Sequence, residues 1–263
     1  ILKNEVVGFW KNFIKYQFLL RELVKKGIVL KYRRSYLGLF WTLLEPLCTM
    51  IVLTIVFGSF FGQGDRLYPV YILSGRLLYT FFNTATKGCM RSMRKNAGMM
   101  KKVYVPKYMY PLSSVLFQYV IFLISLSVLV LIGGILGVRP SIYLMQILIP
   151  LFLLLVLAFG TGMILATLAV FFRDLEYLWG IALMLIMYTS AIFYQPEKVI
   201  NTGNGWVFKI NPLYACIDMF RSAIFGEPLD LSMLKLAVIS CVLTVGVGIY
   251  LFYKKEDQFI LYL

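Results

Sequence analysis

The sequence has no histidine, few acidic residues and little charge of either sign. Only 12 of its 263 residues are Asp or Glu, and 14% are charged, whereas a soluble domain carries about 25% charged residues. Without histidine, the chain lacks the commonest general base and metal ligand. The hydrophobic content of 60% and the mean hydropathy of +0.82 exclude disorder, collagen and coiled coil, and they argue strongly against a soluble enzyme. The composition therefore indicates a membrane protein.

Motifs that would indicate catalysis or nucleotide binding are also missing. The four cysteines follow no metal-ligand or disulfide spacing, so we expect no metal site: Cys48, Cys89, Cys216 and Cys241. No G-x-x-x-x-G-K-[ST] loop occurs, so the chain does not bind ATP through such a loop. The charged residues form no acid–base constellation, and we expect no catalytic residue and no cofactor in this chain.

Long charge-free stretches divide the sequence. None of the following contains a charge: the interval between Lys107 and Arg139, that between Arg139 and Arg173, and the stretches 177–196 and 236–253. The stretches 35–64 and 67–86 contain one charge each, Glu45 and Arg76. A spanning helix needs about 20 mostly apolar residues. We therefore predict an all-α membrane protein in which residues 1–263 form one domain with six spans, at about 36–62, 67–87, 109–137, 143–171, 177–195 and 232–253.

The basic residues are distributed unequally between the two sides of the predicted membrane domain. Nineteen of the 26 Lys and Arg residues fall in the segments 1–34, 87–107, 173–176 and 254–263, which six spans place on one side. Positive charge is retained in the cytoplasm, so we expect both termini to be cytoplasmic. Topology and attraction to anionic lipid explain the net charge of +14. No basic stretch lies on a soluble domain, and we expect no nucleic-acid partner.

The segment 1–34 has helical spacing of apolar residues but too much charge to span a membrane. Its apolar and aromatic positions include Val6, Phe9, Trp10, Phe13, Leu20 and Val24, and Lys residues lie mostly elsewhere around the helix. This pattern predicts an amphipathic helix lying in the inner membrane interface. The alternative is an amphipathic helix that packs on another subunit.

The predicted loop between spans two and three has the features of a docking element. Asn96 is a good N-cap, and Pro106 ends the short helix that we expect after it. The apolar knob of this helix would be Met99, Met100 and Val103, flanked by Lys101 and Lys102; flexible Met is favoured on docking surfaces. The alternative is a positively charged cytoplasmic loop that binds no partner.

The predicted external segment 195–232 contains signals for a short re-entrant helix. Asn211 and Pro212 mark its start and Gly226 its end. Its apolar face is expected to consist of Leu213, Ile217, Phe220 and Ile224, with Asp218 and Arg221 paired on another face. Such a helix would enter the outer leaflet or cap a pore, or it would only anchor span six.

Charged and aromatic residues within the spans are candidates for a substrate path. An intramembrane charge costs at least about 2.5 kcal/mol. Arg76 therefore either lies on the route of an anionic substrate or has a structural role, by snorkelling or by pairing with an acidic group. Tyr188, Phe193 and Tyr194 offer flat rings for sugar faces, although lipid contact or packing also explains them. Arg173 and Asp174 are interpreted as a cytoplasmic turn.

Several ordered motifs resemble those of type 2 ATP-binding-cassette export permeases, most closely the polysaccharide and polyol-phosphate branch. The entry to span one contains KYRRSYLGLFW at 31–41 and LEP at 44–46. The coupling loop contains NAG at 96–98, KKVYVP at 101–106 and PLSS at 111–114. The turn after span four contains FRDL at 172–175, and the outer re-entrant segment contains NPL at 211–213.

This resemblance implies a homodimeric permease in the bacterial cytoplasmic membrane, with two separate ATPase subunits that hold ATP and Mg²⁺. Its cargo would be a lipid-linked glycan, such as O antigen, capsule or teichoic acid, moving between the protomers. The candidate path residues, from the motifs and from the charged and aromatic residues of the spans together, are Tyr36, Phe40, Trp41, Arg76, Tyr188, Phe193 and Tyr194. The implied ATPase-coupling residues are Asn96, Met99, Met100, Lys101, Lys102, Val103 and Pro106. Lys31, Arg33 and Arg34 would attract the lipid pyrophosphate or phospholipid headgroups.

Two other functions stay open at this point. A type 2 exporter of drugs or simple lipids would share the architecture and carry fewer aromatic residues along its pore. A membrane-embedded glycan-processing enzyme would need paired acidic residues near a span. The inward acidic candidates for such an enzyme are Asp174, Glu176, Glu256 and Asp257.

Overall fold

The computed structural model describes residues 2–33, 35–58, 65–102 and 105–262, and all regular structure in these ranges is helical. The N-terminal half contains α1 (Leu2–Tyr32), the short 3-10 helix η1 (Gly38–Phe40), α2 (Trp41–Phe57), α3 (Tyr68–Lys95), α4 (Ala97–Met100) and α5 (Met109–Leu136). The C-terminal half contains η3 (Ile142–Ile147), α6 (Leu148–Phe171), α7 (Leu175–Tyr188), α8 (Pro196–Ile200), α9 (Trp206–Ile210), α10 (Pro212–Phe225), α11 (Leu231–Lys255), η4 (Glu256–Gln258) and α12 (Phe259–Tyr262).

Four helical stretches are long and apolar enough to cross a membrane, and they correspond to predicted spans one, three, four and six. They are Gly38–Phe57, Met109–Leu136, Ile142–Phe171 and Leu231–Gln258. The first ends before the predicted boundary at 62, and residues 59–62 lie outside the described ranges. Predicted span five corresponds to α7, which ends at Tyr188 rather than at 195. The residues after Tyr188 leave the helix in an irregular turn, so the last part of the predicted span is not helical.

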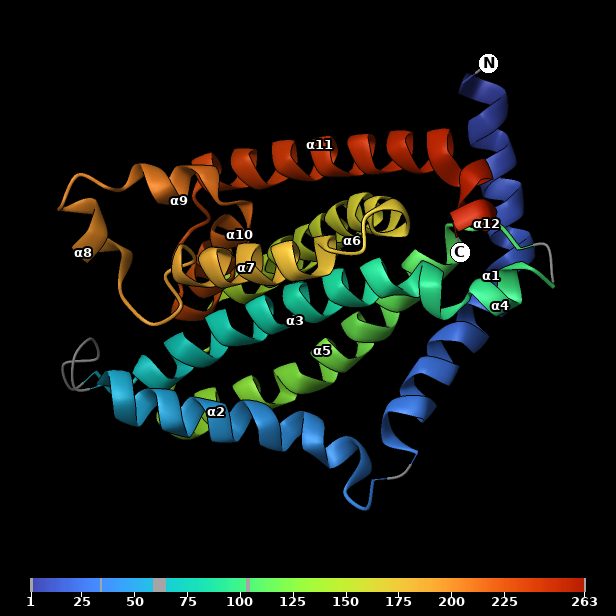
Figure 1. Cartoon of the computed structure of the whole chain (residues 1–263). Helices are drawn as coiled ribbons and strands as arrows, with labels where there is room; N and C mark the ends of the chain where they lie inside the picture. The colour runs from blue at the N-terminus through green and yellow to red at the C-terminus, as the bar shows by residue number, and fades with distance from the viewer. Residues whose placement is uncertain (1, 34, 59–64, 103–104, 263) are drawn as a thin grey trace.

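Predicted span two corresponds to α3, which is long but carries too many polar residues to meet the same criterion of apolarity. Most of its residues are nevertheless buried, because α2, α5, α6 and α10 pack around it (Figure 1). The hydroxyls of Ser74, Thr86 and Ser92 are buried and donate to carbonyls three or four residues earlier in α3. A helix that faces protein on most sides can carry such groups, since no lipid has to solvate them.

Glycines allow α6 to pack closely against its neighbours. A Cβ atom on Gly160 would lie 2.7 Å from the backbone nitrogen of Val245 in α11, and one on Gly162 would lie 2.7 Å from Sγ of Cys89 in α3. Small residues at helix crossings permit close backbone approach, which is a main source of stability between membrane helices.

We expect Gly160→Val to destabilise the protein by about 1–3 kcal/mol, because the new side chain meets backbone atoms that cannot move aside. The measurement is the midpoint of thermal unfolding in detergent. Gly134→Val is the control, since a Cβ at position 134 meets nothing within 4 Å. Equal midpoints for the two variants would contradict the close α6–α11 crossing.

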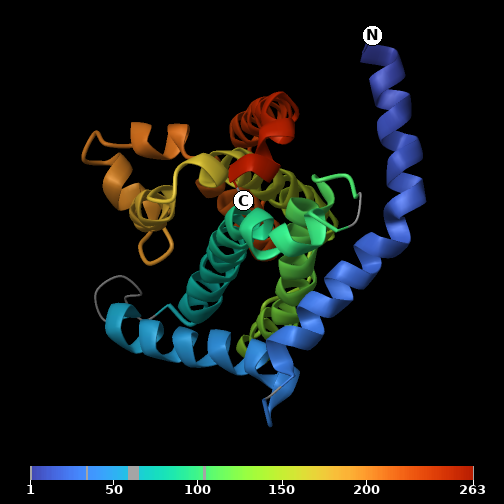
Figure 2. The same ribbon diagram turned by 45° about the vertical axis from the view of Figure 1, so that its right-hand side comes forward.

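The two ends of the bundle differ in character. The helix α1 crosses one end of the bundle, where α4 and the C-terminus also lie, and the first half of α1 extends beyond the bundle (Figures 1 and 2). The short helices α8 and α9 lie at the other end (Figure 1). The predicted N-terminal helix is therefore present. Leu20 is buried, and Leu19 and Leu23 pack on the core, whereas Lys15 and Lys25 are exposed. Side chains 2–14, including the predicted aromatic anchors, lie outside the described set.

Candidate functional site

The predicted coupling helix exists as the single-turn helix α4, but it is shorter than expected. Asn96 occupies the cap position, yet its side chain accepts no hydrogen bond from the helix. Instead its Nδ2 donates to the Ser92 carbonyl oxygen at 2.8 Å. This side chain therefore ties α4 to the end of α3, because the chain runs from α3 into α4 with only one residue between them. Residues 103 and 104, and with them Val103 of the predicted knob, lie outside the described ranges. Beyond them, the carbonyl oxygen of Pro106 accepts a hydrogen bond from the backbone nitrogen of Met109 at the start of α5.

The residues of this short helix and those directly after it differ in exposure. Met99 and Met100 are half-buried and pack against the hydrophobic core of their own chain, so only part of each is available to a partner. Gly98, Lys101 and Lys102 are exposed. The accessible surface of the described part of the loop, residues 97–102, is therefore more basic and less apolar than the sequence predicts.

A cavity of about 520 Å³ lies between α1, α3 and α5 at the same end of the molecule, and we call it the basic cavity. Its lining includes the cations Lys26, Lys31, Arg91 and Lys95, and no carboxylate is among the described residues that line it. The wall also includes Tyr110, whose buried hydroxyl has no hydrogen-bond partner in the described structure. The sequence analysis missed this cavity, because three helices far apart in the chain form it.

The predicted headgroup residues lie beside the basic cavity. Lys31 and Arg33 are exposed and line a smaller opening with Leu30 and Ser35. Arg34 lies outside the described residues. Partial burial lowers the pKa of Lys31, and the negative charge of Glu45 opposes that shift.

Arg76 lies on α3 and is half-buried. Its Nη1 lies 3.5 Å from Sδ of Met187, and its guanidinium carbon lies 5.7 Å from the centre of the Tyr79 ring. Ion pairs among the described residues occur only at Glu176, so the structure pairs Arg76 with no carboxylate. Arg76 and Glu45 both line a cavity of about 100 Å³ between α2, α3 and α5, which also contains Lys31. This cavity shares Lys31 and Gln118 with the basic cavity.

The structure does not bring the predicted aromatic path residues together. Tyr36, Phe40 and Trp41 are exposed at the start of the first apolar stretch, which lies near α1. Tyr188 is exposed at the far end of α7, and Tyr194 is half-buried, with its hydroxyl donating to the Tyr188 carbonyl oxygen.

Phe193 differs from the expectation of a path residue. Its side chain is buried and stacks on Phe57, with ring centres 5.1 Å apart, so in this conformation of the chain it is a packing residue.

The irregular turn after α7 has most of its carbonyls bound by side chains of α3 and α10. Arg221 Nη1 donates to the Ala191 oxygen at 2.9 Å, and Nη2 donates to the Ile192 oxygen at 3.3 Å. Tyrosine hydroxyls from α3 bind further carbonyls. Tyr71 donates to the Tyr194 oxygen at 2.8 Å, its hydroxyl lies 3.1 Å from the Ala191 oxygen, and Tyr68 donates to the Phe193 oxygen. Non-helical backbone inside a membrane protein needs such partners, because lipid supplies none. Ala191 has a φ of +46°, a strained value that these contacts hold.

Sequence reasoning missed this arrangement because it assigned Arg221 to a pair with Asp218. That prediction was wrong: Arg221 is 5% exposed, its guanidinium lies 3.4 Å from the centre of the Tyr71 ring, and it donates to carbonyls. Gly75 makes the arrangement possible, since a Cβ at that position would lie 2.6 Å from Arg221 Nη2. The signal in the sequence was a lone glycine beside Arg76 in an otherwise apolar stretch.

The predicted boundaries of α10 are confirmed. The Asn211 side chain accepts from the backbone nitrogens of Leu213 and Tyr214, and Gly226 ends the helix with a φ of +81°. The predicted apolar face is buried: Leu213, Ile217, Phe220 and Ile224. Other sides of the helix are buried as well, so α10 is a core helix rather than one with a broad polar face.

The described residues contain no group of three or more Cys, Asp or Glu side chains placed to hold a metal ion. Of the acidic candidates of the enzyme alternative, Glu176 is bound by two arginines. The four cysteines are free thiols, and three of them are buried.

Comparison with known proteins places these features in a family. The family model described as ABC-2 type transporter matches residues 19–225. The chain is 26% identical to the O-antigen export system permease protein RfbA of Klebsiella pneumoniae, over 92% of this chain and 93% of that protein. It is 26% identical to RfbA of Myxococcus xanthus, over 95% of this chain and 96% of that protein. It is 22% identical to the polysialic acid transport protein KpsM of Escherichia coli, over 89% of this chain and 92% of that protein. The relatives are named as permease or transport proteins rather than enzymes, and the chain belongs to the ABC-2 type transporter family.

Proposed function

We propose that this chain is the permease subunit of an ATP-driven exporter that moves a lipid-linked polysaccharide across the bacterial cytoplasmic membrane. The basic cavity carries the proposal. It places several cations and an unsatisfied tyrosine hydroxyl beside the interfacial helix α1, where the diphosphate of a lipid-linked glycan would arrive. Phosphate groups are matched by Lys and Arg side chains. The similarity to O-antigen and polysialic acid transport proteins supports the same class of cargo.

In this proposal the domain has six spans, because α3 and α7 also cross the membrane. The helix α3 has 28 residues and a length of about 42 Å at 1.5 Å per residue, which is enough to span. The helix α7 has 14 residues, or about 21 Å, and the side-chain-bound turn after it covers the remaining depth. The short helices α8–α10 then form the extracytoplasmic re-entrant segment.

The cytoplasmic side is proposed to be the end that carries α1, α4 and the C-terminus. The basic segments of the sequence gather at this end, as retention of positive charge in the cytoplasm requires. The helix α1 would lie in the membrane interface and contact lipid headgroups with its lysines.

The partners in the proposal are a second copy of this chain and two cytoplasmic ATPase subunits, which would bind ATP and Mg²⁺. The permease would contact the ATPases through α4 and its exposed Lys101 and Lys102. Exposed apolar residues on α2 and α7, among them Trp41, Ile55 and Tyr188, are available for the second copy or for lipid. The cargo would pass between the two copies.

The test is binding of a lipid diphosphate to the purified protein in nanodiscs. We expect the double variant Lys26→Gln/Lys95→Gln to lower the affinity about 30-fold, since each lysine contributes about 1 kcal/mol to binding an anionic headgroup. The control is Lys209→Gln, an exposed lysine of α9 at the other end of the molecule. Unchanged affinity in the double variant would contradict the proposed cargo site. A second measurement uses the complete transporter with its ATPase subunits. If drugs or simple lipids without a diphosphate stimulated its ATPase activity as much as a lipid diphosphate does, that result would favour the alternative exporter.

A further inference from the structure

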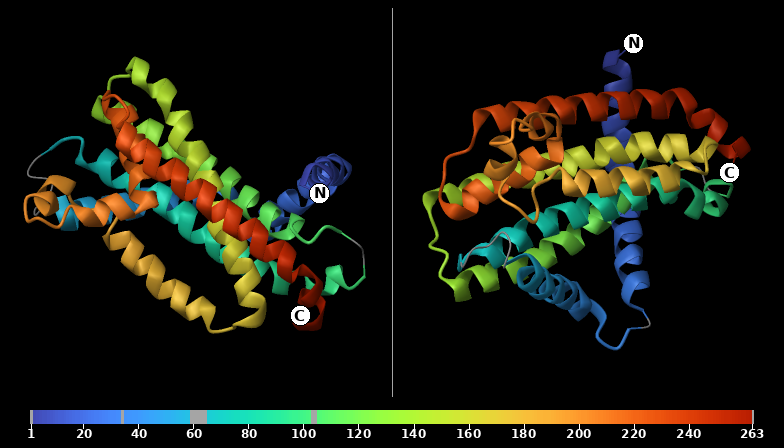
Figure 3. Two further views of the ribbon diagram at one scale, coloured as in Figure 1. Left: turned by 90° about the horizontal axis from the view of Figure 1, so that it is seen from above. Right: turned by 60° about the vertical axis from the view of Figure 1, so that its left-hand side comes forward.

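The helix α7 stands apart from the rest of the bundle. Only Leu183 among its 14 residues is buried. Six of its large apolar or aromatic side chains are exposed: Tyr177, Leu178, Ile181, Met184, Leu185 and Tyr188. Seen from above in Figure 3, left, α7 lies to one side of the bundle formed by α3, α5, α6 and α11. Close packing, which is what holds α6 against α11, therefore contributes little to the position of α7.

The helix α7 has apolar contacts with both α3 and α6, through Leu175 and Trp179. Its polar contacts go to α3, and they follow one another in antiparallel order. Near the start of α7, Trp179 Nε1 donates to Thr86 Oγ1 at 3.0 Å. In the middle, the Tyr79 hydroxyl donates to the Leu183 carbonyl oxygen at 3.0 Å. Near the end, Arg76 approaches Met187. The contacts of Tyr68 and Tyr71 with the following turn complete this series.

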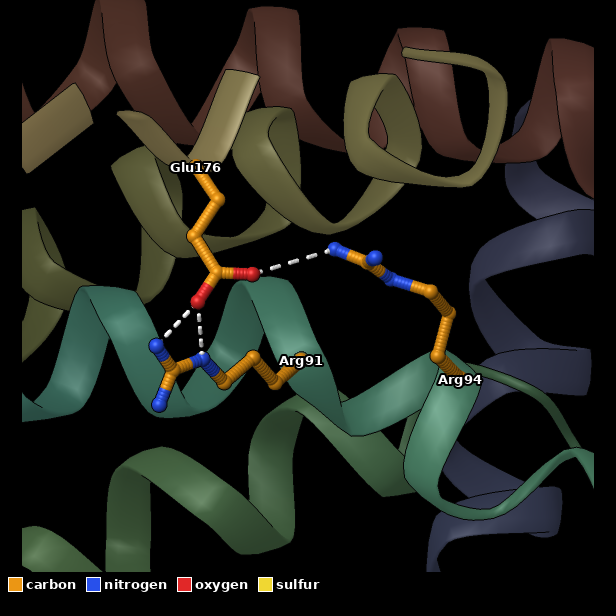
Figure 4. A network of polar contacts seen from close by, with 3 residues as sticks. All are labelled: Arg91, Arg94 and Glu176. Carbon is orange, nitrogen blue, oxygen red and sulfur yellow. Dashed lines mark hydrogen bonds and ion pairs between the residues drawn. The ribbon is translucent and has the colours of Figure 1, made fainter. Parts of the chain in front are cut away.

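One further contact precedes the Trp179 hydrogen bond in this series, and it is ionic (Figure 4). Glu176 lies in the first turn of α7 and its carboxylate lies between two guanidinium groups of α3. One carboxylate oxygen accepts from Arg91, at 2.6 Å from Nε, and the other lies 3.5 Å from Nη2 of Arg94. The Glu176 side chain is 28% exposed, so bulk water screens this pair less than a fully exposed one. If the carboxylate were removed, α7 would no longer supply an ion-pair partner for Arg91 and Arg94.

The two arginines lie in the last turns of α3, next to α4. Asn96 joins the two helices: its backbone nitrogen donates to the Ser92 and Met93 carbonyl oxygens, and its own carbonyl accepts from Met99 and Met100. A displacement of α4 therefore displaces the end of α3 that holds Glu176. Because α7 is otherwise loosely packed, its start would follow that displacement more easily than α5 or α6 would.

We propose that Glu176 is a positioning residue that links α7 to the coupling loop, so that the Arg91–Glu176–Arg94 ion pairs carry the motion of α4 to α7. The link is a property of this chain. Its use in transport rests on the proposed function, in which α4 contacts the ATPase.

The first measurement needs neither ATPase nor cargo. Spin labels at Leu178→Cys on α7 and Val242→Cys on α11, both exposed positions, report the distance between the two helices in nanodiscs. The exposed native Cys48 is replaced by Ala, and the three buried cysteines are kept. We expect Glu176→Gln to broaden and shift this distance distribution. The control is Asp174→Asn, which removes the same charge from an exposed residue two positions earlier.

The second measurement uses the complete transporter with its ATPase. We expect Glu176→Gln to retain the ATPase on copurification and to lower cargo moved per ATP hydrolysed about fivefold, the effect of losing roughly 1 kcal/mol of interaction. Asp174→Asn should behave as the parent protein. The conservative variant Glu176→Asp keeps the negative charge at the start of α7, and we expect it to retain most of the coupling that Glu176→Gln loses.

The outcomes separate this inference from the proposed function. A Glu176→Gln distance distribution identical to that of Asp174→Asn would overturn the link, whatever the cargo is. An altered distance with normal transport per ATP would overturn the role of the link in coupling and leave the proposed function intact. Failure of the parent protein to move a lipid-linked glycan would contradict the proposed function and leave the distance result standing.

Discussion

Arg221→Met is expected to reduce the yield of folded protein to a small fraction of that of the parent protein. The substitution keeps much of the apolar bulk but removes every donor that Arg221 supplies to the turn after α7. The Ile192 carbonyl then loses the partner that Arg221 provides, at a cost of about 1–3 kcal/mol for a buried unsatisfied group. The strained backbone at Ala191 also loses one of its restraints, which adds a similar amount. The sum of the two losses is a large share of the free energy of unfolding, which is about 5–15 kcal/mol for an ordinary protein.

The measurement is the yield of monodisperse protein after detergent extraction, followed by its thermal midpoint. Arg221→Lys should be intermediate, because one ammonium cannot reach the three carbonyl oxygens that the planar guanidinium contacts. Arg139→Met, at an exposed arginine, is the matched control and should behave as the parent protein. Equal yields for Arg221→Met and Arg139→Met would show that the turn is held without Arg221.

Charge reversal on the coupling loop is expected to abolish ATP-driven transport. In the double variant Lys101→Glu/Lys102→Glu, two exposed side chains change sign, so the fold should persist while the ATPase contact is repelled. Like charges placed in an interface cost several kcal/mol, which is enough to reduce ATPase copurification by 100-fold or more. The measurements are copurification with the ATPase and cargo export.

Met100→Asp tests the same contact less cleanly than the lysine variant does. Met100 packs partly on its own core, so the new carboxylate would also weaken the permease itself. The control for charge alone is Lys254→Glu/Lys255→Glu in the last turn of α11. If Lys101→Glu/Lys102→Glu retains the ATPase and exports normally, α4 is not the coupling element.

Much of the fold follows from local properties of the sequence. The four apolar helical stretches were predicted because hydropathy over about 20 residues decides whether a segment can cross a membrane. The start and end of α10 were predicted because Asn211 and Gly226 act on backbone groups within a few residues of themselves. The resemblance of short motifs to a permease family was confirmed by the comparison over most of the chain.

The parts that local patterns could not decide depend on distant neighbours. The sequence left Phe193 open between a path residue and a packing residue, and its ring is buried against Phe57. The Asp218–Arg221 spacing fits a helical pair, yet Arg221 binds carbonyls 29 and 150 residues away. No local pattern contains that information, since a guanidinium binds whichever acceptors the fold places around it.

By itself, the sequence determined that this is a helical membrane protein of a transporter type, which segments are apolar enough to cross the bilayer, and where α10 begins and ends. These are consequences of composition, hydropathy and capping, which act within a few turns of the chain. Only the tertiary structure decided that the polar helix α3 lies at the centre, that three helices enclose the basic cavity, and that Glu176 binds two arginines 82 and 85 residues earlier. Each of these depends on long-range packing, because burial and charge pairing are properties of the space around a side chain rather than of its neighbours in sequence.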